Sequence, residues 1–351
     1  MDFPYDTRIL MGVVQGKEFK TPAFFRDTFF PTVLTSTAKH VMFDKLPNGD
    51  RAVAPFVNRR VGGARIELQG YATEMYEPPV VGNHFTVTPE DGFMRAPGRT
   101  EYDTAGPAAF LDYQINNGLR RIENMIARRE ELMCAQALLN GKIEIKGEGV
   151  ADEIQYWSQL DTAKQPKSGL ATKWTDATAA KTVIGDLAEI SDTVVARSGV
   201  APTRLICGKK VYRTLLNILG ESKLLDSKNV MIGNVAPQAY SNGVRRLGYL
   251  AEPGIEIFSY ADRYTDAEGK VQPIVPDDVC LFVAPEIDTV MAYGAMATGW
   301  AGNGAPRIES GTRFAFERPH DSLEQGRAIY LQSCPLPIVQ STNGFHVLTA
   351  V

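Results

Sequence analysis

The chain has 351 residues, 44% of them hydrophobic, and is therefore long and apolar enough for two domains or for one domain with large extensions. Its 37 basic and 41 acidic residues leave a formal charge of −4, which argues against a surface dedicated to nucleic acid. No stretch approaches the roughly 18 apolar residues of a membrane span and the N-terminus does not resemble a signal peptide, so we expect a protein made in the cytoplasm.

The first 45 residues alternate short apolar clusters with breakers. Residues 24–30 contain four phenylalanines, and so much exposed aromatic surface would promote aggregation. We expect either an arm that packs on its own core or on a neighbouring subunit, or a short amphipathic helix that docks within one subunit. The candidate intersubunit contacts here are Phe24, Phe25, Phe29 and Phe30.

Residues 51–100 contain strand-like runs separated by glycine and proline, which predicts a long β-hairpin or excursion. An isolated two-stranded ribbon is marginal in water, so we expect this segment to gain its order from a partner subunit. Its arginines are balanced by carboxylates. The candidate contacts with a neighbour are Arg59, Arg60, Arg65 and Glu67.

Residues 107–140 carry apolar side chains at spacings of three, four and seven, which predicts one helix about 50 Å long that ends at Gly141. Its other face is charged, and such a face is more often solvated or engaged in intersubunit salt bridges than it is a ligand site. The charged residues are Arg120, Arg121, Glu123, Arg128, Arg129, Glu130 and Glu131.

The remaining elements predict an α+β order, with a boundary to a second lobe near residue 176. Helices are expected near 178–198, ending at Gly199, and over 209–219. Residues 294–304 are rich in glycine, and a plain loop is expected at residues 299–304. Strands are expected at residues 142–146, 153–157, 203–207, 255–258, 279–283, 327–333 and 345–348.

No motif in the chain predicts a catalytic, cofactor-binding or metal site. Residues 207–210 lack the first glycine and the hydroxyl side chain of a phosphate loop, and residues 299–304 lack the order of a dinucleotide loop. Residues 36–39 match S-x-x-K, but its partner motifs are missing. The four histidines form no metal-spaced cluster, and His320 is expected in a surface turn.

Cysteines and paired carboxylates support the same conclusion. The four cysteines are far apart, with no C-x-x-C pair, and are expected to be buried thiols in a reducing cytoplasm. Glu130 and Glu131 are adjacent in sequence, so they cannot face each other as an acid/base dyad.

The succession of aromatic arm, β-excursion, long helix, β-pair, α+β lobe and returning strand resembles the tailed-phage major capsid fold of the Hong-Kong-97 type. Within that fold the chain looks most like the lambda-type major capsid protein E family. The segments that carry this resemblance are residues 24–30, 53–57, 135–142 and 329–337.

The resemblance implies a structural protein of the virion, not an enzyme, that assembles in the host cytoplasm as hexamers and pentamers of an icosahedral shell. It implies scaffolding and portal proteins as partners, a decoration protein as a further candidate, no membrane, no cofactor, and enclosed double-stranded DNA that is not read by sequence. The implied domains are an N-terminal arm (1–45), an extended loop (46–98), a peripheral domain with a spine helix (99–175), an axial domain (176–325) and a return strand (326–351).

Two features depart from some relatives. No lysine lies between Lys45 and Lys142, so an isopeptide cross-link from the extended loop is not expected, and reinforcement of the shell should be non-covalent. The chain starts at the arm, so we expect scaffolding to be a separate protein. Two alternatives stay open at this point: an encapsulin-like compartment shell, and a cytoplasmic α+β enzyme whose site is scattered through the chain.

Overall fold

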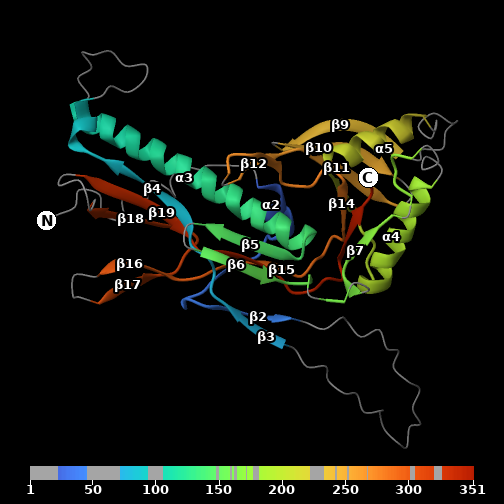
Figure 1. Cartoon of the computed structure of the whole chain (residues 1–351), viewed down its shortest axis with the longest axis horizontal. Helices are drawn as coiled ribbons and strands as arrows, with labels where there is room; N and C mark the ends of the chain where they lie inside the picture. Colours follow the sequence, from blue (N-terminus) through green and yellow to red (C-terminus); the bar gives the residue numbers. More distant parts are fainter. Residues whose placement is uncertain are drawn as a thin grey trace, which may run out of the picture. The chain divides into compact units, whose positions relative to one another are not determined.

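A computed structural model gives the fold of the chain (Figure 1). It divides into two compact units, each built from separate stretches: residues 1–41, 75–134 and 290–337 form the first, and residues 42–74, 135–289 and 338–351 form the second. The structure describes residues 23–45, 72–93, 106–147, 150–158, 160–161, 164–170, 172–176, 182–221, 233–241, 243–250, 253–266, 268–300, 305–319 and 326–351.

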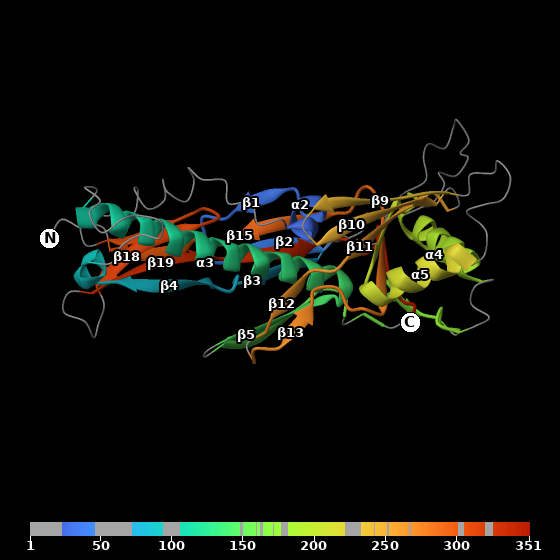
Figure 2. The same ribbon diagram turned by 90° about the horizontal axis from the view of Figure 1, so that it is seen from above.

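The first unit is built around the long helix α3 (Gly106–Leu139), which runs alongside a three-stranded sheet of order β18-β19-β4 (Figures 1 and 2). Its 34 residues confirm the expected helix to within one residue at each end, and 34 residues span about 50 Å. The strands are antiparallel: β18 (Phe314–Pro319), β19 (Arg327–Ser333) and β4 (Val81–Val87). The helix and sheet share a core of Ile115, Leu119, Ile122, Ile126, Ala315, Ile329 and Leu331.

Shorter elements complete this unit. The helix α2 (Phe24–Phe29) precedes β1 (Val33–Thr35), which pairs in parallel with β15 (Thr289–Tyr293) in a sheet of order β1-β15-β20. The loop expected at 299–304 is wrong at residues 299–300, because they form the end of β16, and its residues 301–304 lie outside the described residues. The remaining elements are η1 (Pro89–Phe93), β16 (Met296–Trp300), β17 (Pro306–Glu309) and β20 (Pro335–Val339).

The segment assigned to the extended loop is described only in part. Residues 46–71 lie outside the described residues, and with them Arg59, Arg60, Arg65 and Glu67. On either side, β2 (Val41–Lys45) pairs with β3 (Ala72–Tyr76). The strand β4 falls inside the expected loop range but pairs with β19 in the sheet under α3.

The second unit centres on a seven-stranded mixed sheet of order β7-β21-β14-β8-β11-β10-β9. The helices α4 (Val183–Ser198) and α5 (Lys209–Glu221) cover the same face of this sheet. Leu205 and Cys207 are two positions apart on β8, so their side chains point to one face, and both belong to the core cluster that contains the apolar side chains of the two helices. The strands are β7 (Lys167–Gly169), β8 (Arg204–Cys207), β9 (Gly233–Ser241), β10 (Val244–Leu250), β11 (Ile255–Tyr260), β14 (Val279–Val283) and β21 (Phe345–Thr349).

Two small antiparallel pairs also belong to the second unit: β5 (Lys142–Gly147) with β6 (Val150–Gln155), and β12 (Arg263–Thr265) with β13 (Val271–Pro273). All of these elements agree with the expected α+β order.

Glycines end both long helices where the sequence predicts. Gly199 has a φ of 83° and its N–H donates to the carbonyl of Val195. Gly141 has a φ of 67°, and a Cβ added there would lie 2.3 Å from the indole of Trp157. The Trp157 indole N–H in turn donates to the Ala137 carbonyl at 3.2 Å, so the end of α3 is held by a side chain as well as by its backbone.

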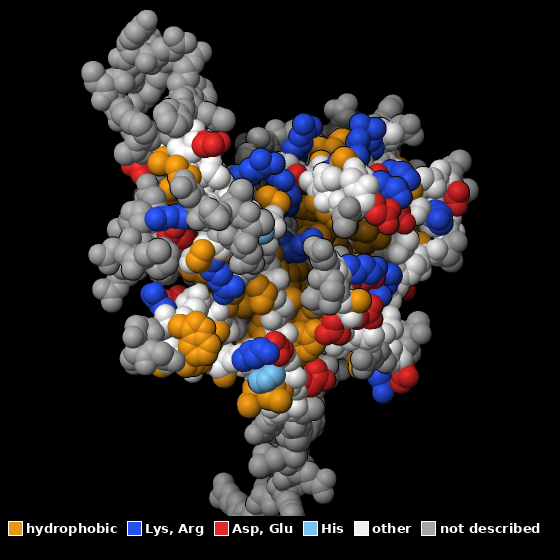
Figure 3. All heavy atoms as spheres, turned by 60° about the vertical axis from the view of Figure 1, so that its left-hand side comes forward, with side chains coloured by type: hydrophobic (Ala, Val, Ile, Leu, Met, Phe, Trp, Pro, Cys, Tyr) orange, Lys and Arg blue, Asp and Glu red, His pale blue; other side chains and the backbone are white. Residues whose placement is uncertain are grey.

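The surface mixes charges of both signs, with hydrophobic side chains exposed among them (Figure 3). The most exposed large hydrophobic side chains among the described residues are Trp300 at 78% and Met42 at 70%. No helix among the described residues is long and apolar enough to cross a bilayer.

Candidate functional site

The three glutamates of α3 do not lie on a solvated face, contrary to expectation. Glu130 and Glu131 are 0% and 2% exposed, and the Glu123 side chain is 13% exposed. The helix is covered on a second side by α2 and by the segment before β18, which the apolar stripe alone does not reveal. The four arginines of the same stretch are exposed, as expected: Arg120, Arg121, Arg128 and Arg129.

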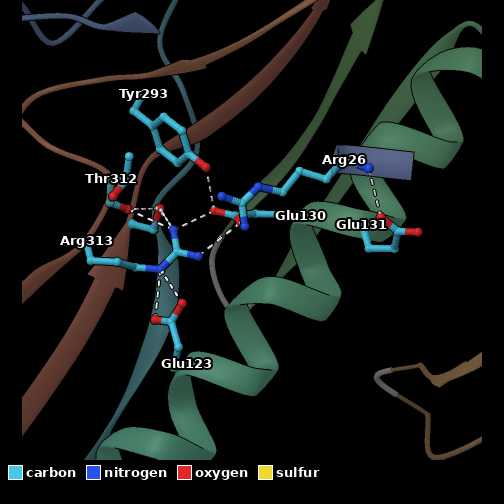
Figure 4. Close-up of polar contacts among 8 residues, drawn as sticks. Arg26, Glu123, Glu130, Glu131, Tyr293, Thr312 and Arg313 are labelled. Atoms are coloured by element: carbon cyan, nitrogen blue, oxygen red, sulfur yellow. Dashed lines mark hydrogen bonds and ion pairs between the residues drawn. The ribbon is translucent and has the colours of Figure 1, made fainter. Parts of the chain in front are cut away.

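Glu130 is the centre of a buried group of charges (Figure 4). Its carboxylate accepts hydrogen bonds from Nη1 and Nη2 of Arg313 at 2.6 and 3.0 Å and forms an ion pair with Arg26 at 3.0 Å. The hydroxyl of Tyr293 donates to it at 3.1 Å. The Nε of Arg313 donates to both oxygens of Glu123, at 2.9 and 2.8 Å. We call this group, together with Glu131, the ionic cluster.

Glu131 caps the helix α2. Its two carboxylate oxygens accept the backbone N–H groups of Phe25 at 2.8 Å and Arg26 at 3.0 Å. Ala23, at the N-cap position, has no side chain that could do this. The first N–H groups of a helix have no partner within the helix and favour negative charge, so Glu131 supplies from α3 the cap that the sequence of α2 lacks.

Arg313 is further fixed by uncharged partners. Its Nη1 donates to the backbone carbonyl of Thr312 at 2.9 Å and to the hydroxyl of Ser333 at 3.3 Å. The Ser333 hydroxyl in turn donates to the same Thr312 carbonyl at 2.8 Å. The guanidinium therefore has acceptors on every side, as a buried charge requires. These contacts link α2, α3, β15 and β19 with the turn before β18.

The electrostatics keep both guanidiniums charged and the phenol neutral. Burial alone would lower the pKa of Arg313, but Glu130 and Glu123 outweigh it and raise the pKa above its usual value. The pKa of Arg26 is raised in the same way, with Glu130 opposing burial. Burial, and then the negative charge of Glu130, raise the pKa of Tyr293, which therefore stays protonated and can donate.

This chemistry suits a structural connection. Glu123 and Glu130 are paired with arginines, Glu131 accepts backbone N–H groups, and the part of the chain that the structure describes has no group of three or more metal-ligating side chains. The ionic cluster joins the short helix at the arm to the long helix and to the strands beside it.

The four phenylalanines of the arm are buried by the chain itself. Phe25 and Phe30 are 0% and 1% exposed, and the ring of Phe24 lies edge-on to Phe25 and Phe29 at 5.9 and 5.8 Å. This is the expected alternative in which a short helix docks within one subunit. Contacts of these rings with a neighbouring subunit stay a prediction.

Sequence reasoning missed the ionic cluster. Phe25 and Glu131 are 106 positions apart, and Glu130 and Arg313 are 183 apart. The one local signal was the charge on a helix face that the fold could cover, at Glu130 and Glu131.

The cysteines and His346 are buried. All four cysteines are free and buried, as expected, and burial raises the pKa of the Cys334 thiol to about 11. Among the histidines, His346 is 3% exposed and its Nε2 lies 2.7 Å from the Ser168 hydroxyl. Burial, and then the charge of Arg197, lower the pKa of His346 to about 4. Cys134 and Cys334 lie in the first unit, and Cys207, Cys280 and His346 in the second.

Comparison with known proteins agrees with a shell subunit. The chain is 25% identical to the major capsid protein of Enterobacteria phage P21 over 361 aligned positions, covering 98% of each chain. A 144-residue part, 41% of this chain and 42% of the other, is 29% identical to the major capsid protein of Escherichia phage lambda. The crystal structure of a putative capsid protein from a prophage of E. coli CFT073 superposes with a TM-score of 0.71, at 19% identity and with 100% of both chains covered.

The expected Hong-Kong-97-type α+β fold is confirmed by this superposition. The family described as phage major capsid protein E matches residues 6–350, nearly the whole chain. This match decides against the two alternatives, an encapsulin-like compartment and a scattered-site enzyme. The chain belongs to the phage major capsid protein E family, and it is a major capsid protein of the head shell of a tailed phage or prophage.

Proposed function

We propose that copies of this chain assemble as hexamers and pentamers that close into an icosahedral shell around double-stranded DNA. The observation that carries this proposal is the family match over residues 6–350, because it spans both structural units instead of a single shared motif. Closed symmetric shells need repeated interfaces between identical chains. Scaffolding and portal proteins would take part in assembly in the host cytoplasm, and a decoration protein could bind the finished shell.

The domain roles follow from the same family. Residues 1–45 would form an arm, 46–98 an extended loop, 99–175 a peripheral domain with α3 as spine, 176–325 an axial domain and 326–351 a return strand. The ionic cluster supports the first of these roles, since it holds residues 24–29 of the arm, the helix α2, against α3 through Glu130 and Glu131. A firmly anchored arm base would let the residues before it reach a neighbour without loosening the subunit.

The contacts of the extended loop are a separate part of the proposal. Arg59, Arg60, Arg65 and Glu67 would form salt bridges with an adjacent subunit. Reversing the three arginine charges should reduce assembly, because like charges then face each other, while circular dichroism stays that of the folded subunit. Unchanged assembly of the charge-reversed chain would remove these residues from the interface.

Size-exclusion chromatography with negative-stain electron microscopy tests the assembly itself. The purified full-length chain should elute as capsomers or as megadalton shells. A chain that stays monomeric at all concentrations, with or without a co-expressed scaffolding protein, would contradict the proposal.

A further inference from the structure

The middle of α3 carries a positive surface charge that a count of charges along the sequence does not reveal. Residues 113–131 contain four arginines and three glutamates, which nearly cancel when counted along the chain. The fold separates them: the three glutamates turn inward to the ionic cluster, and the arginines stay outside. We call the exposed set the arginine face; its members are Arg120, Arg121, Arg128 and Arg129.

Helix geometry points Arg121 and Arg128 to one side of α3, and Arg120 and Arg129 to opposite flanks of that side, about 180° apart around the axis. Arg121 and Arg128 are seven residues apart and so project to nearly the same side, with a rise of about 10 Å between them. Arg120 and Arg129 flank them, and all four lie within about 14 Å along the axis. Among the residues that the structure describes, Arg121, Arg128 and Arg129 form no ion pair. Their positive charge is therefore available to a partner.

We propose that the arginine face binds the phosphate backbone of double-stranded DNA without reading its sequence. This rests on the proposed function, because a shell that encloses DNA brings phosphate to its wall at high local concentration. Guanidinium groups match phosphate oxygens through paired N–H donors. The two arginine pairs, at 120–121 and 128–129, are about 12 Å apart along the helix, close to the roughly 12 Å width of the major groove of B-DNA.

Charge complementarity favours DNA over a second copy of this chain as the occupant. The chain as a whole has a net charge of only −4, spread over 41 acidic and 37 basic residues, whereas DNA carries about one negative charge per 1.7 Å of its axis. An acidic polypeptide is the competing partner, and the experiment includes it as an outcome.

The test is fluorescence anisotropy of a labelled 30-base-pair duplex with the full-length chain, kept as unassembled subunits or capsomers, across a series of salt concentrations. If the three arginines without an ion pair each neutralise one phosphate, the logarithm of the association constant should fall with the logarithm of salt at a slope of about −2.7. Replacing all four arginines of the face with glutamine should remove that dependence. The conservative pair Arg121→Lys and Arg128→Lys should retain it.

A matched control removes the same number of exposed positive charges from the second unit: Lys210→Gln, Arg213→Gln, Arg245→Gln and Arg263→Gln. This variant should bind DNA with the slope of the natural chain. The proposal is overturned if the variant of the arginine face binds DNA like the natural chain, or if the control loses as much. A polyglutamate that displaces the duplex more effectively than unlabelled DNA would also overturn it.

Negative-stain microscopy of the same variants separates this proposal from the proposed function. Shells that form normally from a chain that no longer binds DNA would support the arginine face as a DNA contact. If the natural chain forms no capsomers, the shell proposal fails. The salt dependence of DNA binding by the two glutamine variants still tests whether the arginine face binds DNA. Circular dichroism should be unchanged, since these four side chains are exposed.

Discussion

Replacing Glu130 with glutamine perturbs the centre of the ionic cluster at nearly constant volume. The carboxylate is fully buried and serves two guanidiniums and one phenol, with distances from 2.6 to 3.1 Å. The amide cannot neutralise Arg313, whose side chain is 9% exposed, although Glu123 still pairs with its Nε. Arg26, with 27% of its side chain exposed, can recover some solvation. The loss is therefore dominated by Arg313.

Breaking a buried ion pair on one side costs about 3–5 kcal/mol, and the remaining Glu123 contact favours the lower end of about 3 kcal/mol. For a unit of 150–250 residues, about 3 kcal/mol corresponds to a fall of roughly 6–12 °C in Tm. The double variant Glu130→Gln with Arg313→Gln should cost less than the sum of the two single changes, because neither member of the Glu130–Arg313 pair is then left buried without the other. The assay is thermal unfolding of unassembled subunits by circular dichroism, with hydrogen exchange locating the loss at α2 and α3.

The matched control is Glu268→Gln, which breaks an exposed pair with Lys270 whose side chains are 74% and 70% accessible. Such pairs contribute at most about 1 kcal/mol, so its Tm should barely change. If Glu130→Gln leaves Tm as unchanged as the control does, or if the two single changes at Glu130 and Arg313 add fully in the double variant, the description of the ionic cluster as a coupled unit is refuted.

Three further predictions follow from the packing, the buried histidine and the lysine distribution. A Cβ at Gly118 would lie 2.6 Å from the ring of Phe85, so Gly118→Ala should destabilise the chain by about 1–3 kcal/mol despite the better helix propensity of alanine. Adding Phe85→Leu to the alanine variant should restore its Tm, whereas a Tm of the alanine variant above that of the natural chain would contradict this. Because the pKa of His346 is about 4 when folded and about 6.5 when unfolded, its contribution to stability is complete above about pH 6.5 and is lost towards pH 4, by up to about 3 kcal/mol. Urea midpoints of His346→Gln should therefore depend less on pH than those of the natural chain, and an identical dependence would count against the buried neutral imidazole. Because residues 46–141 contain no lysine, boiled mature capsids should run on an SDS gel as one band near 38.5 kDa, and a covalent ladder would contradict non-covalent reinforcement.

Local patterns were sufficient to predict the elements that depend on neighbours in sequence. The helix α3 was predicted because its apolar period is continuous and Gly141 ends it, and β19 (Arg327–Ser333) was predicted with its observed bounds because breakers at Gly326 and Pro335 flank it. The hairpin of β16 and β17 was missed, since glycine-rich sequence favours a loop unless a partner strand lies alongside.

The ionic cluster could not be predicted, because it joins segments far apart in the chain: Glu131 lies 106 positions from Phe25, and Glu130 lies 183 positions from Arg313. The face of α3 illustrates the reason. Arg128, Arg129, Glu130 and Glu131 are four successive charges, and the sequence gives no sign that two are exposed and two are buried. That division is made by α2 and by Arg313, which only the tertiary fold brings to the helix.

The most direct test of the central conclusion is electron cryomicroscopy of particles assembled from the full-length chain. The predicted result is a closed icosahedral shell in which both the six-fold and the five-fold capsomers are built from this fold, with α2 held against α3. A chain that remains a 38.5 kDa monomer under all assembly conditions, or particles whose density does not accommodate this fold, would contradict it.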